Sequence, residues 1–275
     1  MTLAVRNTVI HLGAVTAITL FCGFGFVGYQ MVVDPTPWGM PLEWHHTWLA
    51  WSWQVGARDV VASLVTTGAL GIVASVGLIG ASRAFRRVSS AEVYFFALFL
   101  ICLAFEQLRL VQLYLLQLSL PAVYGTLITR LVIGARIGGW FSFFAASLYA
   151  VGIDYPRIGS ITIALGLLAF LFVYFVPVDT VAVNATLLHP IAGQSSLELA
   201  LLLVGAMSVI NYVIAGVRGH RERGFLMALA ATSLVVAQVI VWSVPSVSWL
   251  IAGVVLCVYG VFTFILITRA HFLWY

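Results

Sequence analysis

The sequence contains very little charge. Only 8% of its 275 residues are Asp, Glu, Lys or Arg and 63% are hydrophobic, whereas soluble proteins carry about 25% charged residues. A water-soluble fold of this length could not bury so much apolar surface. The composition therefore excludes a soluble enzyme, a nucleic-acid-binding domain and a disordered chain, and it predicts an integral membrane protein.

Lysine is absent, so all thirteen basic side chains are arginines. Without a lysine there is no amine that could form a retinal Schiff base, which excludes a seven-helix rhodopsin. Cysteine is scarce as well, because Cys22, Cys102 and Cys257 are the only three. Each falls in an apolar run without CxxC spacing, which is typical of small buried hydrophobic residues rather than of a disulfide framework.

Long apolar runs dominate what remains. A helix needs about 20 apolar residues to cross the hydrocarbon of a bilayer. Eight runs reach that length, and they lie at residues 8–32, 59–81, 91–118, 122–150, 159–177, 197–217, 224–244 and 247–268. We predict an all-α fold, a polytopic membrane helical bundle of eight transmembrane helices in a single domain, residues 1–275. The first run is too long for a cleavable signal peptide, so we expect it to be retained.

Local signals support these boundaries. Ser89-x-x-Glu92 and Ser195-x-x-Glu198 fit capping boxes, which predicts both glutamates at helix starts. The order of loops in residues 1–150 recurs in residues 151–275: a long outer loop, a basic inner loop and a tight outer turn with proline. This order indicates either a 4+4 pseudo-repeat or a coincidence of loop lengths, because no residue-level similarity supports a repeat.

The arginines predict the orientation. With the N-terminus inside, nine arginines fall in inner segments and one, Arg58, falls in an outer segment. The positive-inside rule then places both termini in the cytoplasm. We expect a multi-pass protein of the bacterial inner (cytoplasmic) membrane, in contact with the lipid bilayer. In its second basic loop Arg218, Arg221 and Arg223 are a candidate contact for a protein partner.

Four ionisable side chains fall at membrane depth, where charge is costly and marks a site or a pair. Glu106 and Arg109 lie on the third run, and Arg130 and Arg136 lie on the fourth. Counted from the turn at Pro121 at 1.5 Å per residue, Glu106 and Arg136 both lie about 22 Å deep. This predicts that they contact each other across two antiparallel helices.

The charges of this group do not balance. One carboxylate against three guanidinium groups leaves a formal excess of +2, and we expect Glu198 near the outer surface rather than at this depth. Arg130 can snorkel outward. The remaining excess predicts either a site for an anionic lipid or a carboxylate ligand, or a buried structural ion-pair network. The candidate ligand-binding residues are Glu106, Arg109, Arg130, Arg136, Gln117 and Trp53.

Residues 34–58 form an aromatic outer loop. From residue 42 onward the spacing places Trp44, Trp48 and Trp51 on one stripe, which predicts a short amphipathic interfacial helix. Trp242 and Trp249 are assigned to the same outer belt. The alternative is a lid over a cavity, with Trp53 pointing inward.

A metal or haem site at this loop has little support. His45, His46 and Glu43 lie together, but adjacent histidines point about 100° apart on a helix and cannot readily chelate one ion. The tryptophan-rich stretch superficially resembles the haem-handling motif of cytochrome c maturation proteins, but the Trp-Asp adjacency of that motif is missing. We therefore expect no cofactor and no metal.

No catalytic motif is present: the chain has no HExxH, nucleophile elbow or paired membrane acids. Within the third run, residues 94–109 resemble the spans of bacterial multi-span sensor modules. We expect an outward-facing ligand-binding, sensor- or receptor-like subunit, or an accessory scaffold. The alternative is a transporter or channel for an anion or small organic acid. We expect the inner half of the bundle to lack the polar residues that would continue a transport path, which counts against this alternative. The second alternative is a membrane-embedded enzyme or a haem- or metal-handling protein.

Overall fold

The structure is a computed structural model, and it describes residues 3–33, 60–85, 90–118, 120–152, 158–180, 183, 186–218, 221–243 and 247–273. Within these ranges the chain forms the helices α1 (Leu3–Val33), α2 (Val60–Ala84), α3 (Ala91–Ala104), η3 (Phe105–Gln107), α4 (Leu108–Gln117), α5 (Ala122–Ala150), α6 (Ile158–Phe175), α7 (Gln194–Arg218), α8 (Arg221–Ser243) and α9 (Val247–Leu273). The all-α prediction is confirmed.

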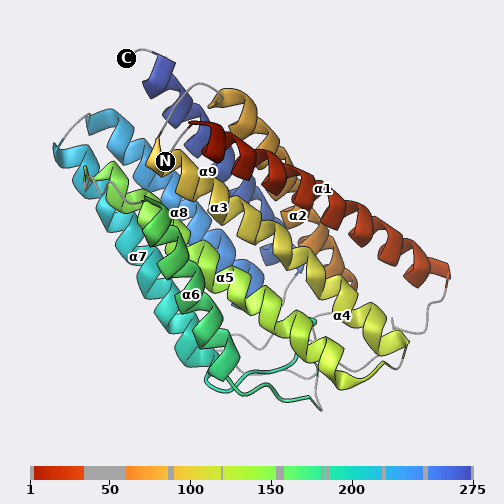
Figure 1. Cartoon of the computed structure of the whole chain (residues 1–275). Helices are drawn as coiled ribbons and strands as arrows, with labels where there is room; N and C mark the ends of the chain where they lie inside the picture. Colours follow the sequence, from red (N-terminus) through yellow and green to blue (C-terminus); the bar gives the residue numbers. More distant parts are fainter. Residues whose placement is uncertain are drawn as a thin grey trace.

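Among the described residues, eight helical spans are long and apolar enough to cross a membrane, as predicted. The third span consists of α3, η3 and α4 in series. The helices run side by side as one elongated bundle, and the start of α1 and the end of α9 lie at the same end of it (Figure 1). We call this the terminal end and the opposite one the loop end. The orientation in the membrane and the 4+4 pseudo-repeat stay predictions.

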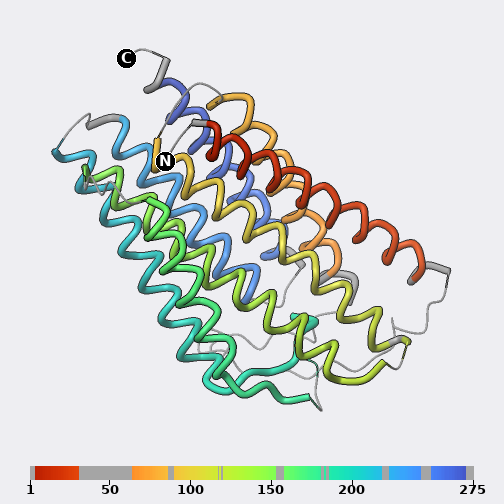
Figure 2. Tube along the Cα trace, viewed as in Figure 1, coloured from red at the N-terminus to blue at the C-terminus, as the bar shows by residue number. Residues whose placement is uncertain are grey.

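The spans differ in how deeply they lie in the bundle. α2, the third span and α8 are largely buried, whereas α1 and α6 expose most of their apolar side chains. α6 packs on α5, and α8 lies between α7 and α9 (Figure 2). A helix that contacts lipid on one side and protein on the other needs apolar residues around its whole circumference.

The middle of the third span contains a tightened turn. Residues 105–107 form a 3₁₀ turn between α3 and α4, and the side-chain amide of Gln107 donates to the carbonyl oxygen of Ala104 at 3.2 Å. Gly71 of α2 leaves room for this side chain, because a Cβ there would lie 2.6 Å from Gln107 Oε1. A 3₁₀ stretch inside a helix often marks a hinge, and this one includes Glu106.

The segment between α6 and α7 folds back into the bundle at the loop end, and we call it the inserted segment. Val178 and Ile191 form an antiparallel bridge, and residues 186–190 are buried. Leu187 lies in the left-handed region (φ 64°) and is fully buried. Such a conformation costs a bulky residue about 1–2 kcal/mol, so the burial of its side chain must hold it there.

Both predicted capping boxes are replaced by other contacts. The N-cap of α3 is Ser90, and the Glu92 side chain pairs with Arg223 of α8. α7 begins at Gln194, whose amide donates to Glu198 at 3.2 Å, so that glutamate lies beyond the first turn. Each carboxylate faces the bundle rather than its own helix end. The predicted interfacial helix of residues 42–58 lies outside the described residues.

The helices α7 and α8 approach each other closely at two glycines, and this contact can be tested by substitution. A Cβ on Gly216 would lie 3.1 Å from the Cα of Gly224, so the two backbones touch without side chains between them. Gly224→Ala is expected to destabilise the fold by about 1–3 kcal/mol because the helices must separate. Thermal unfolding in detergent, followed by circular dichroism, measures the change.

The matched control for this substitution is Gly166→Ala. Gly166 is also helical, but nothing lies within 4 Å of the position of its Cβ. Alanine there is expected to be neutral or to stabilise by up to about 1 kcal/mol, because it has the higher helix propensity. Equal destabilisation by both substitutions would contradict the close packing of α7 on α8.

Candidate functional site

The predicted intramembrane charges lie in the interior of the bundle. Glu106 of η3 and Arg109 of α4 form an ion pair, and both residues are at least 97% buried. They are three residues apart, so the helix itself brings them to one face. The pair therefore follows from local spacing alone.

A tryptophan lies between two arginines in this region. The guanidinium carbon of Arg109 is 3.7 Å from the ring centroid of Trp242, and that of Arg136 is 3.6 Å from the same centroid. Two guanidinium groups this close to one centroid must occupy opposite faces of the indole. Trp242 is 4% exposed, so its assignment to an interfacial belt was wrong.

The predicted Glu106–Arg136 ion pair does not form. Among the described residues the ion pairs are Glu106–Arg109 and Glu92–Arg223, and neither includes Arg136. Arg136 is close enough to Glu106 for their charges to interact, but its Nε is buried without a hydrogen-bond partner. The carboxylate of Glu106 is paired instead with Arg109, three residues along its own span.

Glu198, which was expected near the outer surface, is the fifth residue of α7 and faces the interior of the bundle. Its depth in the membrane stays a prediction. Glu198 is 6% exposed, its charge interacts with that of Arg136, and its Oε2 has no hydrogen-bond partner. Glu106, Glu198, Arg109 and Arg136 together carry a formal charge of zero. We call these four residues with Trp242 the charged layer.

The sequence contained a signal for Glu198 that hydropathy alone does not show. Leu201, Gly205, Ser208 and Tyr212 follow Glu198 at spacings of three and four residues, and all of them are buried on α7. A stripe of small and polar residues at this spacing is typical of a helix face that packs against protein. Glu198 lies at its loop-end limit.

The remaining candidate residues do not join the charged layer. Arg130 of α5 is partly exposed, and its Nε has no hydrogen-bond partner. Gln117 ends α4, and its side chain lies outside the described part of the chain, as does the whole of Trp53. Their predicted role in ligand binding stays a prediction.

Two small clefts meet at Arg136. The loop-side cleft is lined by Arg136 and Trp242 together with residues of the inserted segment, among them Thr186 and His189. The core cleft is lined by Arg136, Glu106, Cys102, Phe99 and Gln238. Each leaves about 10 Å³ of space, which is about the volume that one water molecule needs. Anything larger requires the inserted segment or a side chain to move.

Five aromatic side chains form a closed ring on the terminal side of the charged layer. Phe96, Phe99, Phe143, Tyr212 and Phe264 contact one another in a cycle, with centroids 3.7–6.2 Å apart. They come from α3, α5, α7 and α9, and each is at least 96% buried. We call them the aromatic ring. Such a layer places a large, well-packed apolar surface between the charged layer and the terminal end.

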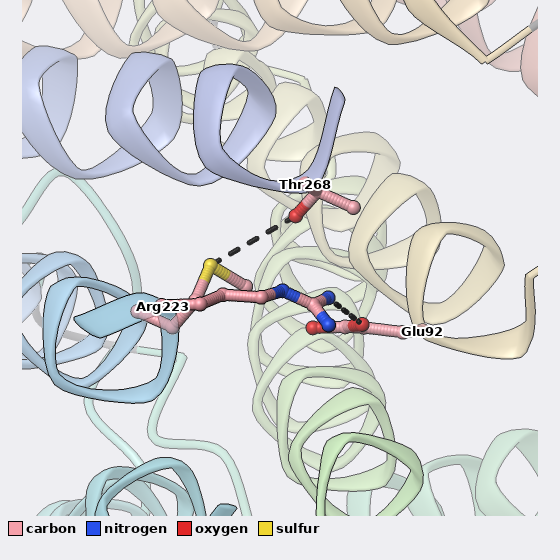
Figure 3. A network of polar contacts seen from close by, with 4 residues as sticks. Glu92, Arg223 and Thr268 are labelled. Carbon is pink, nitrogen blue, oxygen red and sulfur yellow. Dashed lines mark hydrogen bonds and ion pairs between the residues drawn. The ribbon is translucent and has the colours of Figure 1, made fainter. Parts of the chain in front are cut away.

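Beyond the aromatic ring lies a second, partly buried ion pair, the terminal pair, in which Glu92 is buried and the side chain of Arg223 is 25% exposed. Arg223 of α8 donates to Glu92 of α3 at 3.2 Å, while Thr268 of α9 donates to the sulfur of Met227 at 3.8 Å beside it (Figure 3). With both termini in the cytoplasm, this pair would lie in the inner half, which was expected to lack polar residues. Arg218, Arg221 and Arg223 were the predicted contacts for a protein partner. Arg223 instead points into the bundle toward Glu92, and Arg218 is exposed. The side chain of Arg221 lies outside the described part of the chain.

Within the described ranges, no group of three His, Cys, Asp or Glu residues could hold a metal ion. His45, His46 and Glu43 lie outside those ranges. His189, in the segment between α6 and α7, is buried, and its Nε2 and the Gln112 amide nitrogen lie 2.7 and 2.6 Å from the position of a Cβ on Gly125.

The fold defines a polytopic integral membrane protein, with eight helical spans in the part of the chain that the structure describes. The chain matches no known protein family, and it matches neither a characterised protein nor a solved structure. Any function must therefore be argued from the charged layer and its surroundings.

Proposed function

We propose that this protein is a receptor-like membrane protein that binds a small anion, of the carboxylate or phosphate class, at Arg136 beneath the segment 186–194. The observation that carries the proposal is Arg136 at the junction of the two clefts, with a buried Nε that has no hydrogen-bond partner and no ion pair among the described residues. Glu106 is committed to Arg109 and Glu198 accepts from Gln194. Arg136 therefore keeps hydrogen-bond donors for a ligand oxygen.

The surroundings support a site that opens in one direction. The inserted segment covers Arg136 from the loop end, and the aromatic ring separates the charged layer from the terminal end. With both termini in the cytoplasm of a bacterium, the ligand would enter from outside. Because the clefts are so small, binding must displace the segment or a lining side chain, and such a coupled movement is what a receptor needs.

Anion-dependent stability tests the proposal. The protein in detergent, at constant ionic strength, is heated in sodium chloride and in the same buffer with 10 mM acetate or phosphate. We expect one of the two anions to raise the midpoint of unfolding by about 2–5 °C, because a ligand that binds only the folded state stabilises it. Arg136→Gln is expected to abolish the increase.

Arg130→Gln is the matched control, since it removes an arginine of the same helix that lies apart from the clefts. It should keep the response to the anion. An increase of equal size in Arg136→Gln, or no increase with either anion in the wild-type protein, would contradict the proposed site and favour a scaffold role.

A transporter of anions or small organic acids is the second candidate, favoured by the 3₁₀ turn at Glu106. Interrupted helices near mid-membrane are common at transport sites. Uptake of radiolabelled acetate into proteoliposomes separates the two candidates. A receptor binds the anion without net uptake, whereas a transporter must also open the aromatic ring.

A further inference from the structure

Two groups of charges lie on the same pair of spans. The third span carries Glu92 and Glu106, 14 residues or about 21 Å apart along a helix. α8 carries Arg223 and Trp242, about 28 Å apart by the same rise. These two spans therefore meet through polar side chains at two levels, the terminal pair and the charged layer.

The terminal pair is only partly satisfied. Glu92 Oε1, Arg223 Nε and the Tyr212 hydroxyl are buried without hydrogen-bond partners. The three side chains come from α3, α8 and α7, and their charges and dipoles are close enough to interact. Unmet polar atoms in a low-dielectric interior are costly, whereas a fully satisfied network is rigid. A rearrangement that supplies partners to these atoms is therefore favoured, which suits a switch better than a rigid clamp.

The aromatic ring lies between the two levels. On the terminal side, Phe96 of the ring is four residues from Glu92, about one turn along α3. The hydroxyl of Tyr212, another member of the ring, is near enough to Glu92 and Arg223 for their charges to act on it. On the other side, Phe99 belongs to the ring and lines the core cleft beside Cys102 and Glu106. The rings of Tyr212 and Phe99 both contact Phe143, so the aromatic ring offers a path between the two levels.

The third span can also deform between the two levels. The 3₁₀ turn at residues 105–107 separates α3, which holds Glu92, from α4, which holds Arg109. A change of pitch there would move Glu92 relative to the charged layer without breaking either helix. Local geometry of this kind is a recurrent hinge.

We propose that the terminal pair and the charged layer are coupled, so that rearrangement of Glu92–Arg223 reshapes the core cleft through the aromatic ring and the 3₁₀ turn. The coupling is a property of the empty bundle and does not require the anion proposed above. It gives the terminal end, where a signal would leave the membrane, a buried element that senses the state of the mid-membrane site.

The native cysteines report this coupling. Cys102 lines the core cleft, Cys22 is exposed on α1, and Cys257 is fully buried on α9. N-ethylmaleimide labelling of the purified chain, quantified for each cysteine by peptide mass spectrometry, measures all three rates in one sample. Glu92→Gln is expected to raise the Cys102 rate about five-fold or more, which is the usual scale of coupling between sites.

Control variants separate coupling from general loosening. Cys22 and Cys257 should stay within about two-fold of wild type, and the exchanged pair Glu92→Arg with Arg223→Glu should restore the Cys102 rate. Tyr212→Phe keeps the aromatic ring and removes only the hydroxyl, so it supplies a milder test if Glu92→Gln does not fold. It should raise the Cys102 rate in the same direction.

Two outcomes would overturn the coupling. One is a wild-type Cys102 rate in folded Glu92→Gln or Tyr212→Phe. The other is a rise at Cys257 equal to that at Cys102, which indicates global loosening. Neither outcome bears on anion binding at Arg136, because the labelling contains no ligand.

Discussion

Glu106→Gln is expected to lower the free energy of unfolding by about 3–5 kcal/mol, the usual cost of removing one partner of a buried ion pair. The substitution keeps the shape of the side chain but leaves Arg109 buried without its carboxylate. Arg136, whose charge also interacts with Glu106, loses part of its compensation as well. Unfolding in mixtures of dodecyl maltoside and SDS, followed by circular dichroism, measures the loss.

A double-mutant cycle shows whether the loss belongs to the pair. Glu106→Gln combined with Arg109→Gln removes both charges, so it should cost less than the sum of the single substitutions, by about 1–3 kcal/mol. If the two effects simply add, the ion pair does not stabilise the bundle. A wild-type stability for Glu106→Gln would likewise contradict the structural importance of the charged layer.

Trp242→Ala is the second substitution with a large expected effect. The indole is 4% exposed and separates two guanidinium groups at 3.6 and 3.7 Å. Truncation of a buried tryptophan costs about 3–5 kcal/mol, and each desolvated cation–π contact adds up to about 2 kcal/mol. Without the ring, Arg109 and Arg136 would also repel each other across the vacated space.

Two other substitutions serve as controls for this experiment. Trp242→Phe keeps an aromatic face and should recover part of the loss, since phenylalanine is the weaker cation–π partner. Trp249→Ala changes a tryptophan of α9 that is 41% exposed, and it should cost about 1 kcal/mol or less. Comparable losses at Trp242 and Trp249 would argue against the contact of Trp242 with both arginines.

The charged layer was predictable in part from the sequence. Glu106 and Arg109 are three residues apart, so any helix over this run brings them together whatever lies around it. The equal depth of Glu106 and Arg136 was also a sound expectation, because helical rise is constant and their charges do interact. Direct pairing failed because depth does not specify the rotation of a helix about its axis.

Composition and the length of apolar runs determined the class of protein and its eight spans, because the bilayer fixes how long and how apolar a crossing helix must be. Only the tertiary structure decided that Trp242 lies between two arginines, that Glu198 balances the charge and that Glu92 reaches Arg223. Lipid is as apolar as a protein core, so hydrophobic periodicity does not tell which face of such a helix turns inward. That choice depends on contacts between helices far apart in the chain.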